Sequence, residues 1–214
     1  GGISVAFVAL PLALSFGVLS GAGAAAGVYG AICTGILTSM FGGTKAQISG
    51  PTGAMTVVLV SMADKYGMDG LVASMILAGV FEIIMGLLKL GKYIRLIPKP
   101  VMVGFTNGIA ILIFTSQFKY FNMSPVLCSI SIALMLILPM INKKIPYAII
   151  TVIVGTLLSK FFFPMPADAV VGTIPLMIPA LQIPDFMAMN MVDVCQAGLT
   201  LALLGAIESL LSAM

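Results

Sequence analysis

The sequence contains no histidine, and this absence removes whole classes of catalytic and metal sites. A serine nucleophile activated by histidine, an HExxH zinc site and a histidine-ligated haem are all excluded. The three cysteines form no CxxC pair, and Cys33 and Cys128 fall in apolar stretches, where a thiol behaves as a small apolar side chain. We therefore expect neither an enzyme nor a bound cofactor.

Charge is also scarce, because Asp, Glu, Lys and Arg make up only 8% of the 214 residues, whereas hydrophobic residues make up 60%. This composition lies outside the range of soluble domains and matches a chain whose solvent is lipid. A membrane span needs ~20 mainly apolar residues to cross ~30 Å of hydrocarbon, and the chain offers about eight such stretches. We predict an all-α membrane protein. The predicted spans cover residues 3–20, 24–41, 47–63, 70–90, 100–121, 124–141, 145–163 and 193–214.

Both ends of the chain are apolar. No cleavable signal is visible at the start, so we interpret the first stretch as a span. Met214 falls inside an apolar helix, and we expect the chain to be part of a longer protein.

The basic residues predict the orientation, because Lys and Arg gather on the cytoplasmic side of a membrane. A cytoplasmic N-terminus places more of them inside than outside, so we expect a multi-pass protein of the cell membrane in that orientation. The same rule explains the basic stretch 89–99, and nucleic acid is not an expected partner. The inner side would receive Lys45, Lys89, Lys92, Arg95, Lys99, Lys143 and Lys144, and the outer side Lys65, Lys119 and Lys160.

The stretch QISGPTGAMTVVL, residues 47–59, interrupts an apolar region with glycine, proline and hydroxyl residues. In hydrocarbon, non-helical backbone survives only where it is buried in protein or lines a wet cavity. Pro51 suits the first turn of a helix, and Ser49 or Thr52 can cap that turn. We predict a broken third helix that begins within the membrane and turns its free N–H groups toward an anion in a cavity. The alternative is a proline-kinked helix packed on a neighbour.

Residues around this helix start would form the anion site. The small side chains after Thr52 let a ligand approach the backbone closely. The first span carries an interruption in VALPLALSFG, where Pro11 breaks an intrahelical hydrogen bond and frees a carbonyl that could face the same cavity. Phe16 would supply an aromatic wall, although a phenylalanine in a membrane helix more often packs in the core or faces lipid. We expect anion binding at Phe16, Thr52, Gly53 and Ala54.

Glu208 lies deep within the last apolar stretch, LALLGAIESLLSAM. An ionisable group there costs ~3 kcal/mol or more on insertion scales, so it should face the bundle interior and bind a cation or a proton. Ser212 follows one turn later on the same face and offers a second oxygen. We predict a coupling site for sodium or a proton at Glu208 and Ser212. The alternative is a protonated Glu208 bonded to a neighbouring helix, and for Glu82 we expect a structural role.

Longer segments of the chain resemble a known family of anion transporters. VALPLALSFGVLSGAGAAAGVYGAICTGILTSMFGG and FGGTKAQISGPTGAMTVVL look like the opening of the SulP (sulfate permease) family, and LALLGAIESLLSAM looks like its eighth helix. The resemblance implies a UraA-like fold of fourteen helices in two inverted seven-helix repeats, usually followed by a STAS domain. This chain would hold the first repeat plus helix eight, so the C-terminal half and any STAS domain would be missing partners.

The resemblance also implies a division into domains and the roles of several residues. Helices one to four (1–97) would belong to the core and helices five to seven (98–163) to the gate. An extracellular connection (164–192) would lead to helix eight (193–214) in the core. Thr52, Gly53 and Ala54 match the start of half-helix three, which receives the anion, and Phe16 falls at an aromatic position of that site. Glu208 and Ser212 match positions that hold sodium or a proton.

The resemblance implies secondary active transport of a small inorganic anion, bicarbonate or sulfate, coupled to sodium or protons, by a protein that forms a homodimer in the lipid bilayer. The chain departs from many eukaryotic members at Leu12, where these have glutamine, so sulfate itself is not specified. A nucleobase transporter of the same fold, or an anion channel or structural membrane subunit, stays open as an alternative.

Overall fold

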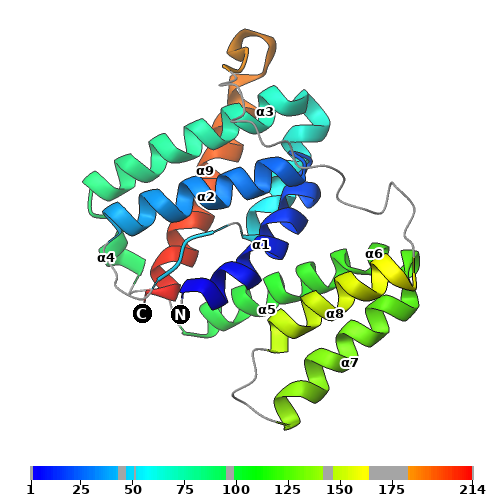
Figure 1. The fold of residues 1–214 in the computed structure, drawn as a ribbon. Helices are drawn as coiled ribbons and strands as arrows, with labels where there is room; N and C mark the ends of the chain where they lie inside the picture. The colour runs from blue at the N-terminus through cyan, green and yellow to red at the C-terminus, as the bar shows by residue number, and fades with distance from the viewer. Residues whose placement is uncertain are drawn as a thin grey trace. The chain divides into compact units, whose positions relative to one another are not determined.

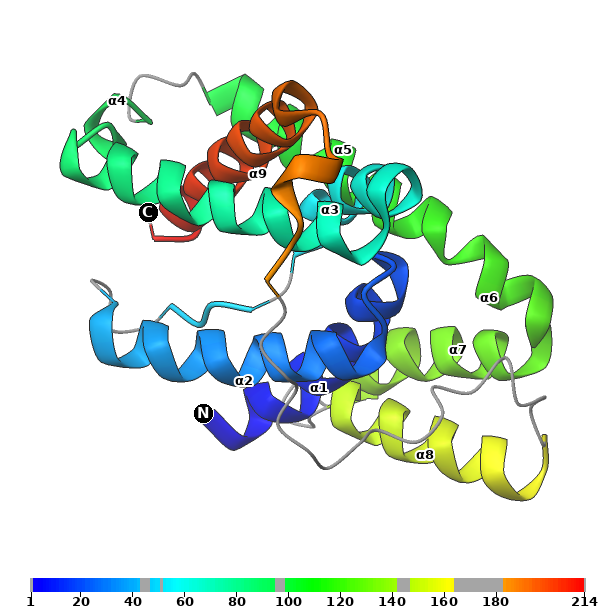
Figure 2. The ribbon, with the colours of Figure 1, turned by 90° about the horizontal axis from the view of Figure 1, so that it is seen from above.

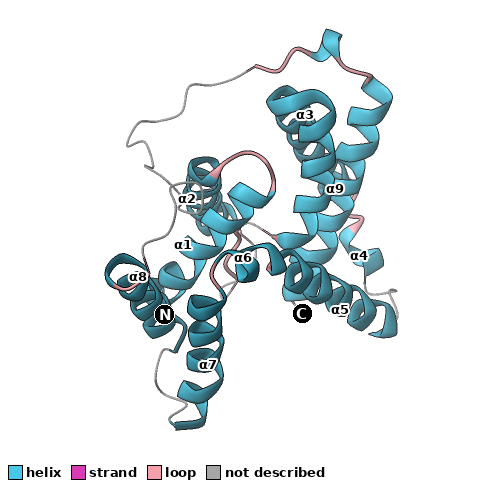
Figure 3. Ribbon diagram, turned by 90° about the vertical axis from the view of Figure 1, so that its right-hand side faces the viewer, coloured by secondary structure: helices cyan, strands magenta, loops and turns pink. Residues whose placement is uncertain are grey.

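The computed structural model describes residues 2–42, 47–50, 52–94, 99–141, 147–163 and 183–213. Figure 3 shows helices and no strand in these ranges, so the all-α prediction is confirmed for them. In chain order the elements are α1 (Gly2–Leu19), α2 (Ala24–Phe41), α3 (Gly53–Leu87), α4 (Gly91–Ile94), α5 (Lys99–Ser116), α6 (Phe118–Met123), α7 (Pro125–Ile141), α8 (Tyr147–Phe161), the 3-10 turn η2 (Phe186–Ala188) and α9 (Met191–Ser212) (Figure 1).

The helices have the length and surface of membrane spans. Among the described residues, α2, α3 and α9 are long and apolar enough to cross a bilayer, and shorter apolar helices occur at Val5–Leu19, Val103–Thr115, Pro125–Ile141 and Tyr147–Phe161. Large apolar side chains lie on their surfaces: Phe41 and Met140 are 80% and 85% exposed. Such exposure fits contact with lipid, and the chain is a membrane protein with several apolar helices.

α3 contains two of the predicted spans in one run of 35 residues. A straight helix of that length would measure roughly 50 Å, well beyond ~30 Å of hydrocarbon. The run is kinked at Gly67, whose φ of 65° and ψ of −152° lie outside the helical region. A positive φ is a conformation that glycine adopts without steric cost. Gly67 therefore separates the spans predicted at 47–63 and 70–90.

The predicted interruption of the first span is wrong. α1 is helical from Gly2 to Leu19, with Pro11 inside it. Proline removes one backbone donor, yet membrane helices tolerate this loss where neighbouring groups satisfy the freed carbonyl. In the span predicted at 100–121, by contrast, the chain changes from α5 to α6 at Gln117.

α9 packs along α3, and the two helices lie side by side in all three ribbon views (Figures 1, 2 and 3). Their contact is close because Gly198 of α9 has no side chain. A Cβ atom there would lie 2.8 Å from the Leu77 Cβ and 3.2 Å from the Ser74 carbonyl oxygen. The interface also buries Ala73 and Val194 completely. Small residues thus let these two helices approach each other as membrane helices commonly do.

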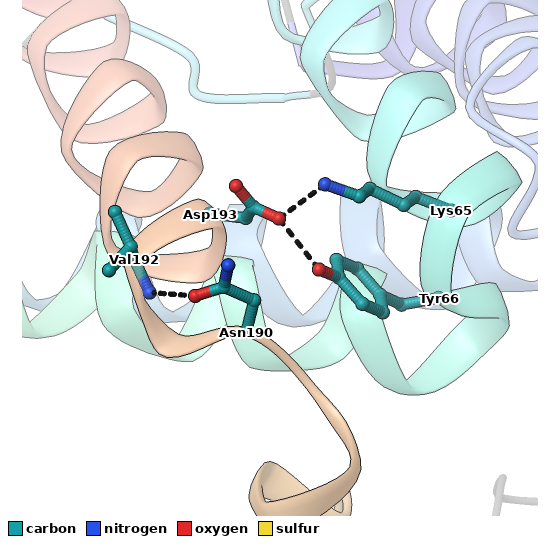
Figure 4. Close-up of polar contacts among 5 residues, drawn as sticks. All are labelled: Lys65, Tyr66, Asn190, Val192 and Asp193. Atoms are coloured by element: carbon teal, nitrogen blue, oxygen red, sulfur yellow. Dashed lines mark hydrogen bonds and ion pairs between the residues drawn. The ribbon is translucent and has the colours of Figure 1, made fainter.

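Polar contacts fasten the start of α9 to the middle of α3 (Figure 4). The Lys65 ammonium and the Asp193 carboxylate form an ion pair. The Tyr66 hydroxyl donates a hydrogen bond of 2.6 Å to the same carboxylate oxygen. Asn190 caps α9, since its side-chain oxygen accepts a hydrogen bond of 3.0 Å from the Val192 N–H. We call the Lys65, Tyr66 and Asp193 contacts the α3–α9 clamp.

Glycines bring α1 and α2 together at one point. A Cβ atom on Gly27 of α2 would lie 2.0 Å from the Ala13 carbonyl oxygen and 3.0 Å from the Gly17 Cα of α1. No larger residue fits at Gly27 unless the backbone moves. The closeness of the two helices is therefore a property of this glycine pair.

The chain divides into two compact units by its internal contacts. One unit consists of Gly1–Leu12 and Ile113–Ile174, and the other of Ala13–Leu112 and Pro175–Met214. In the first unit α7 packs against α8, as Figure 2 illustrates. The second unit contains every residue that we discuss as a candidate site. Of the predicted connection 164–192, residues 164–182 lie outside the described residues, and the core and gate assignment stays a prediction.

Candidate functional site

The start of α3 has the form that the sequence predicts. Residues 47–50 are not helical, Thr52 has extended backbone angles, and the helix begins at Gly53. The Thr52 hydroxyl oxygen accepts a hydrogen bond of 3.4 Å from the Ala54 N–H, so Thr52 caps the helix. Pro51, which we expected in the first turn, lies outside the described residues.

The residues at this helix start are small and covered. Gly53 and Ala54 are buried, and Thr52 is half-buried. Neither Gly53 nor Ala54 carries atoms beyond Cβ, so their own side chains leave the first amides of the helix uncovered. The helix dipole adds a positive partial charge at the same end. Chemically, this end can receive a negatively charged group.

Phe16 is buried on α1, with 8% of its surface exposed. It lies in the same compact unit as the start of α3. Whether it serves as a wall of the anion site stays a prediction.

Glu208 and Ser212 share one face of α9 and line the same cavity. The cavity has a volume of about 370 Å³, and its opposite wall comes from α5. Glu208 is half-buried and Ser212 is exposed. Their spacing on one face thus brings both side chains to one cavity, and their role as a coupling site stays a prediction. The complete lining is Phe105, Thr106, Ile109, Glu208, Leu211 and Ser212.

The cavity offers a carboxylate and a hydroxyl to a cation. Oxygen atoms of this kind suit sodium or a proton. Among the described residues, no group of three or more His, Cys, Asp or Glu side chains could hold a metal ion. A cation held by Glu208 and Ser212 would need further oxygens from backbone, water or the rest of the protein.

Glu82 lies closer to α9 than the sequence indicates. A Cβ atom on Gly205 would lie 2.3 Å from a Glu82 carboxylate oxygen and 2.9 Å from the Met55 methyl carbon. Gly205 thus makes room for the carboxylate one turn before Glu208. In the described part of the chain Glu82 forms no ion pair or hydrogen bond, and its expected structural role stays a prediction.

Sequence reasoning missed a contact between the stretch before α3 and the end of α9. The Gln47 side-chain N–H group donates hydrogen bonds to the Ser212 hydroxyl, at 2.7 Å, and to the Ser209 carbonyl oxygen, at 3.0 Å. The only signal in the sequence is an amide side chain at the beginning of a non-helical stretch. Its partners lie more than 160 positions away, so no local pattern could identify them.

Comparisons with known proteins show what this chain is similar to. The profile described as Sulfate permease family matches residues 1–125 and 122–214. YvdB of Bacillus subtilis is 36% identical, and the match covers 100% of this chain and 46% of YvdB. The bicarbonate transporter BicA of Picosynechococcus sp. is 34% identical over 99% of this chain and 44% of BicA. This chain therefore spans less than half the length of these two relatives.

A solved structure resembles the fold over the whole chain. The transmembrane domain of a cyanobacterial bicarbonate transporter BicA aligns with a TM-score of 0.82 and 33% identity, covering 100% of this chain and 63% of that one. A plant relative, the chloroplastic sulfate transporter 4.1 of Arabidopsis thaliana, is 28% identical over 86% of this chain and 33% of its own length.

Proposed function

Because this chain belongs to the sulfate permease family, we propose that it forms part of a secondary transporter for a small inorganic anion, bicarbonate or sulfate. The family consists of transporters, so the expectation that the chain is not an enzyme is confirmed. The relatives named as bicarbonate and sulfate transporters support the choice of these two anions.

The observation that carries the proposal is the start of α3. A non-helical stretch leads into a capped helix whose first residues, Gly53 and Ala54, are small and buried. In a chain of apolar helices such a stretch needs a polar environment, and a substrate cavity provides one. The anion would lie against the first amides of α3, where the helix dipole and the N–H groups of the first turn favour negative charge. Phe16 would lie beside it.

The driving force would come from a cation at Glu208 and Ser212. A carboxylate within a membrane helix is costly unless it binds a cation or a proton, and the cavity at Glu208 gives either one access. Binding of the cation would favour the conformation that also binds the anion. The two solutes would then cross the membrane together, and the cation gradient would drive anion uptake.

The rest of the protein would complete the transporter. We place this chain in the first half of two inverted seven-helix repeats, with the second half supplying the opposite wall of the anion site. Movement of the core (1–97 and 193–214) against the gate (98–163) would expose the site to each side in turn. The protein would be a homodimer in the cell membrane with a cytoplasmic N-terminus and, in many relatives, a STAS domain.

Uptake by the full-length protein in liposomes tests this proposal. Radiolabelled sulfate and bicarbonate are offered with and without inward gradients of sodium or protons, and uracil serves as a competitor. We expect saturable uptake of one anion against its gradient, dependent on one cation gradient and insensitive to uracil. Uptake that is not saturable or never exceeds equilibrium would contradict a secondary transporter and favour a channel.

A further inference from the structure

Gln47 joins two places that the proposed function treats as separate sites. It belongs to the non-helical stretch that leads into α3, and Thr52, which caps α3, follows five positions later. Its side chain is bonded to the last turn of α9, where Ser212 lines the cavity with Glu208. We infer that Gln47 is a positioning residue that couples cation binding at Glu208 and Ser212 to anion binding at the start of α3. This inference rests on the proposed function.

The hydrogen bonds fix the geometry of the link. A glutamine side-chain amide has two N–H donors, and here one partner is a hydroxyl and the other a backbone carbonyl. The Ser212 hydroxyl in turn donates a hydrogen bond of 2.9 Å to the Ser209 carbonyl oxygen. Gln47, Ser209 and Ser212 therefore form a closed triangle of hydrogen bonds, which holds the Ser212 oxygen in one orientation.

A cation in the cavity would act on this triangle directly. Ser212 can offer a remaining lone pair of its hydroxyl oxygen to the cation, because the hydroxyl proton already points to Ser209. Coordination would fix Ser212, and with it the hydrogen-bond acceptor of Gln47. The occupied cation site would thus hold Gln47 more firmly than the empty one.

The chain between Gln47 and Thr52 can transmit that change. Residues 47–50 are not helical and Thr52 has extended backbone angles, and each of the five residue steps from Gln47 to Thr52 spans at most ~3.6 Å. A fixed Gln47 therefore limits where Thr52 and the first amides of α3 can lie. Ordering this stretch before the anion arrives lowers the entropic cost of anion binding, which is positive cooperativity.

Direct binding of radiolabelled sulfate and bicarbonate to the full-length protein tests the role of Gln47. Affinity for the anion is measured in sodium chloride, in choline chloride, and at acidic and neutral pH, and the ratio of affinities with and without the cation gives the coupling factor. Such factors commonly lie between about 5 and 150. The variants are Gln47→Met, which keeps the length and loses both donors, and Gln47→Ala. Gln196→Ala is the matched control, because Gln196 is an exposed glutamine on α9.

We expect the coupling factor to fall at least five-fold in both Gln47 variants, while the affinity without cation stays within two-fold of the unmodified protein. Gln196→Ala should change neither quantity. By thermodynamic reciprocity, saturating anion should also lose its effect on cation affinity in the Gln47 variants. If Gln47→Ala does not fold, Gln47→Met gives the same readout with the side-chain volume preserved.

Two results would overturn the inference while leaving the proposed function in place. One is an unchanged coupling factor in Gln47→Met. The other is an equal loss of affinity with and without the cation, because a residue that merely holds the stretch in place would affect both measurements by the same factor. If the unmodified protein binds neither anion, or binds one with no dependence on either cation, the proposed function itself fails and the role of Gln47 fails with it.

Discussion

The two ends of α9 meet the rest of their compact unit in different ways. At the Asp193 end an ion pair and a tyrosine hydroxyl hold the helix to α3, and Val194 is completely buried just inside. At the Ser212 end the helix borders a cavity, and the Gln47 side chain connects it to the stretch before α3. The first end is packed by many neighbours, whereas the second depends on a few polar contacts.

This difference fits the different roles that we propose for the two ends of α9. A packed interface has one low-energy arrangement and resists change, because interiors are nearly incompressible. Polar contacts beside a cavity can form and break as solutes come and go, since water or a bound ion can replace them. The Asp193 end would thus act as the fixed support of α9, and the Ser212 end as the part that responds to ligands.

Added bulk at Gly198 should break the fixed end most severely. In Gly198→Leu the new side chain would meet the Leu77 Cβ and the Ser74 carbonyl oxygen, so α3 and α9 must separate. Overpacking lowers the free energy of unfolding by about 1–3 kcal/mol. Because the new side chain would meet backbone atoms, we expect a loss of about 3 kcal/mol or more. Thermal unfolding in detergent should show a large drop in the unfolding temperature or no folded protein. Gly79→Leu, on α3 with open space at Gly79, is the matched control and should fold normally.

Removal of the charge at Glu208 should abolish the response of the Ser212 end of α9 to the cation without unfolding the protein. Glu208→Gln keeps the size of the side chain but offers no negative charge to a cation, so cation-dependent anion uptake in liposomes should disappear. The unfolding temperature should stay close to that of the unmodified protein. Glu208→Asp, which retains the charge, should keep part of the coupling. Unchanged sodium and proton dependence in Glu208→Gln would remove Glu208 from the coupling site.

Removal of the ion pair should have the smallest effect. The Lys65 and Asp193 side chains are 57% and 27% exposed, and solvent screens pairs of this kind. Asp193→Asn should therefore lower the unfolding temperature slightly, and less at high salt, with anion affinity and cation coupling unchanged. Tyr66→Phe, which removes only the hydroxyl of the clamp, tests the hydrogen bond separately. A changed coupling factor in Asp193→Asn would contradict the view that this end is only a support.

The parts of the fold that the sequence predicts are those that local chemistry determines. Apolar length predicts the helices, and the cap at Thr52 follows from a hydroxyl residue before a helix with small residues in its first turn. The spacing of Glu208 and Ser212 places them on one face. Pro11 shows the limit of this reasoning, since a proline in a membrane helix can break the helix or be accommodated, and neighbours decide which.

Contacts between distant segments could not be predicted. The Glu82 carboxylate lies against Gly205, although nothing near either residue in the sequence indicates this pairing. The contact between Gln47 and Ser212 could not be predicted either, because helix packing, not local pattern, brings the two residues together. One sequence contains no signal for such pairs. Residues that position a site are therefore harder to predict than residues that carry its charge.

The central claim is that the first amides of α3 receive the anion. The most direct test is to measure anion binding by Gly53→Leu. Binding of radiolabelled sulfate and bicarbonate to the full-length protein is compared among the unmodified protein, Gly53→Leu and Gly30→Leu, a helical glycine with open space around it. We predict no measurable binding by Gly53→Leu and normal binding by Gly30→Leu, and thermal unfolding in detergent shows whether each variant is folded. Normal anion affinity in a folded Gly53→Leu protein would show that the anion binds elsewhere.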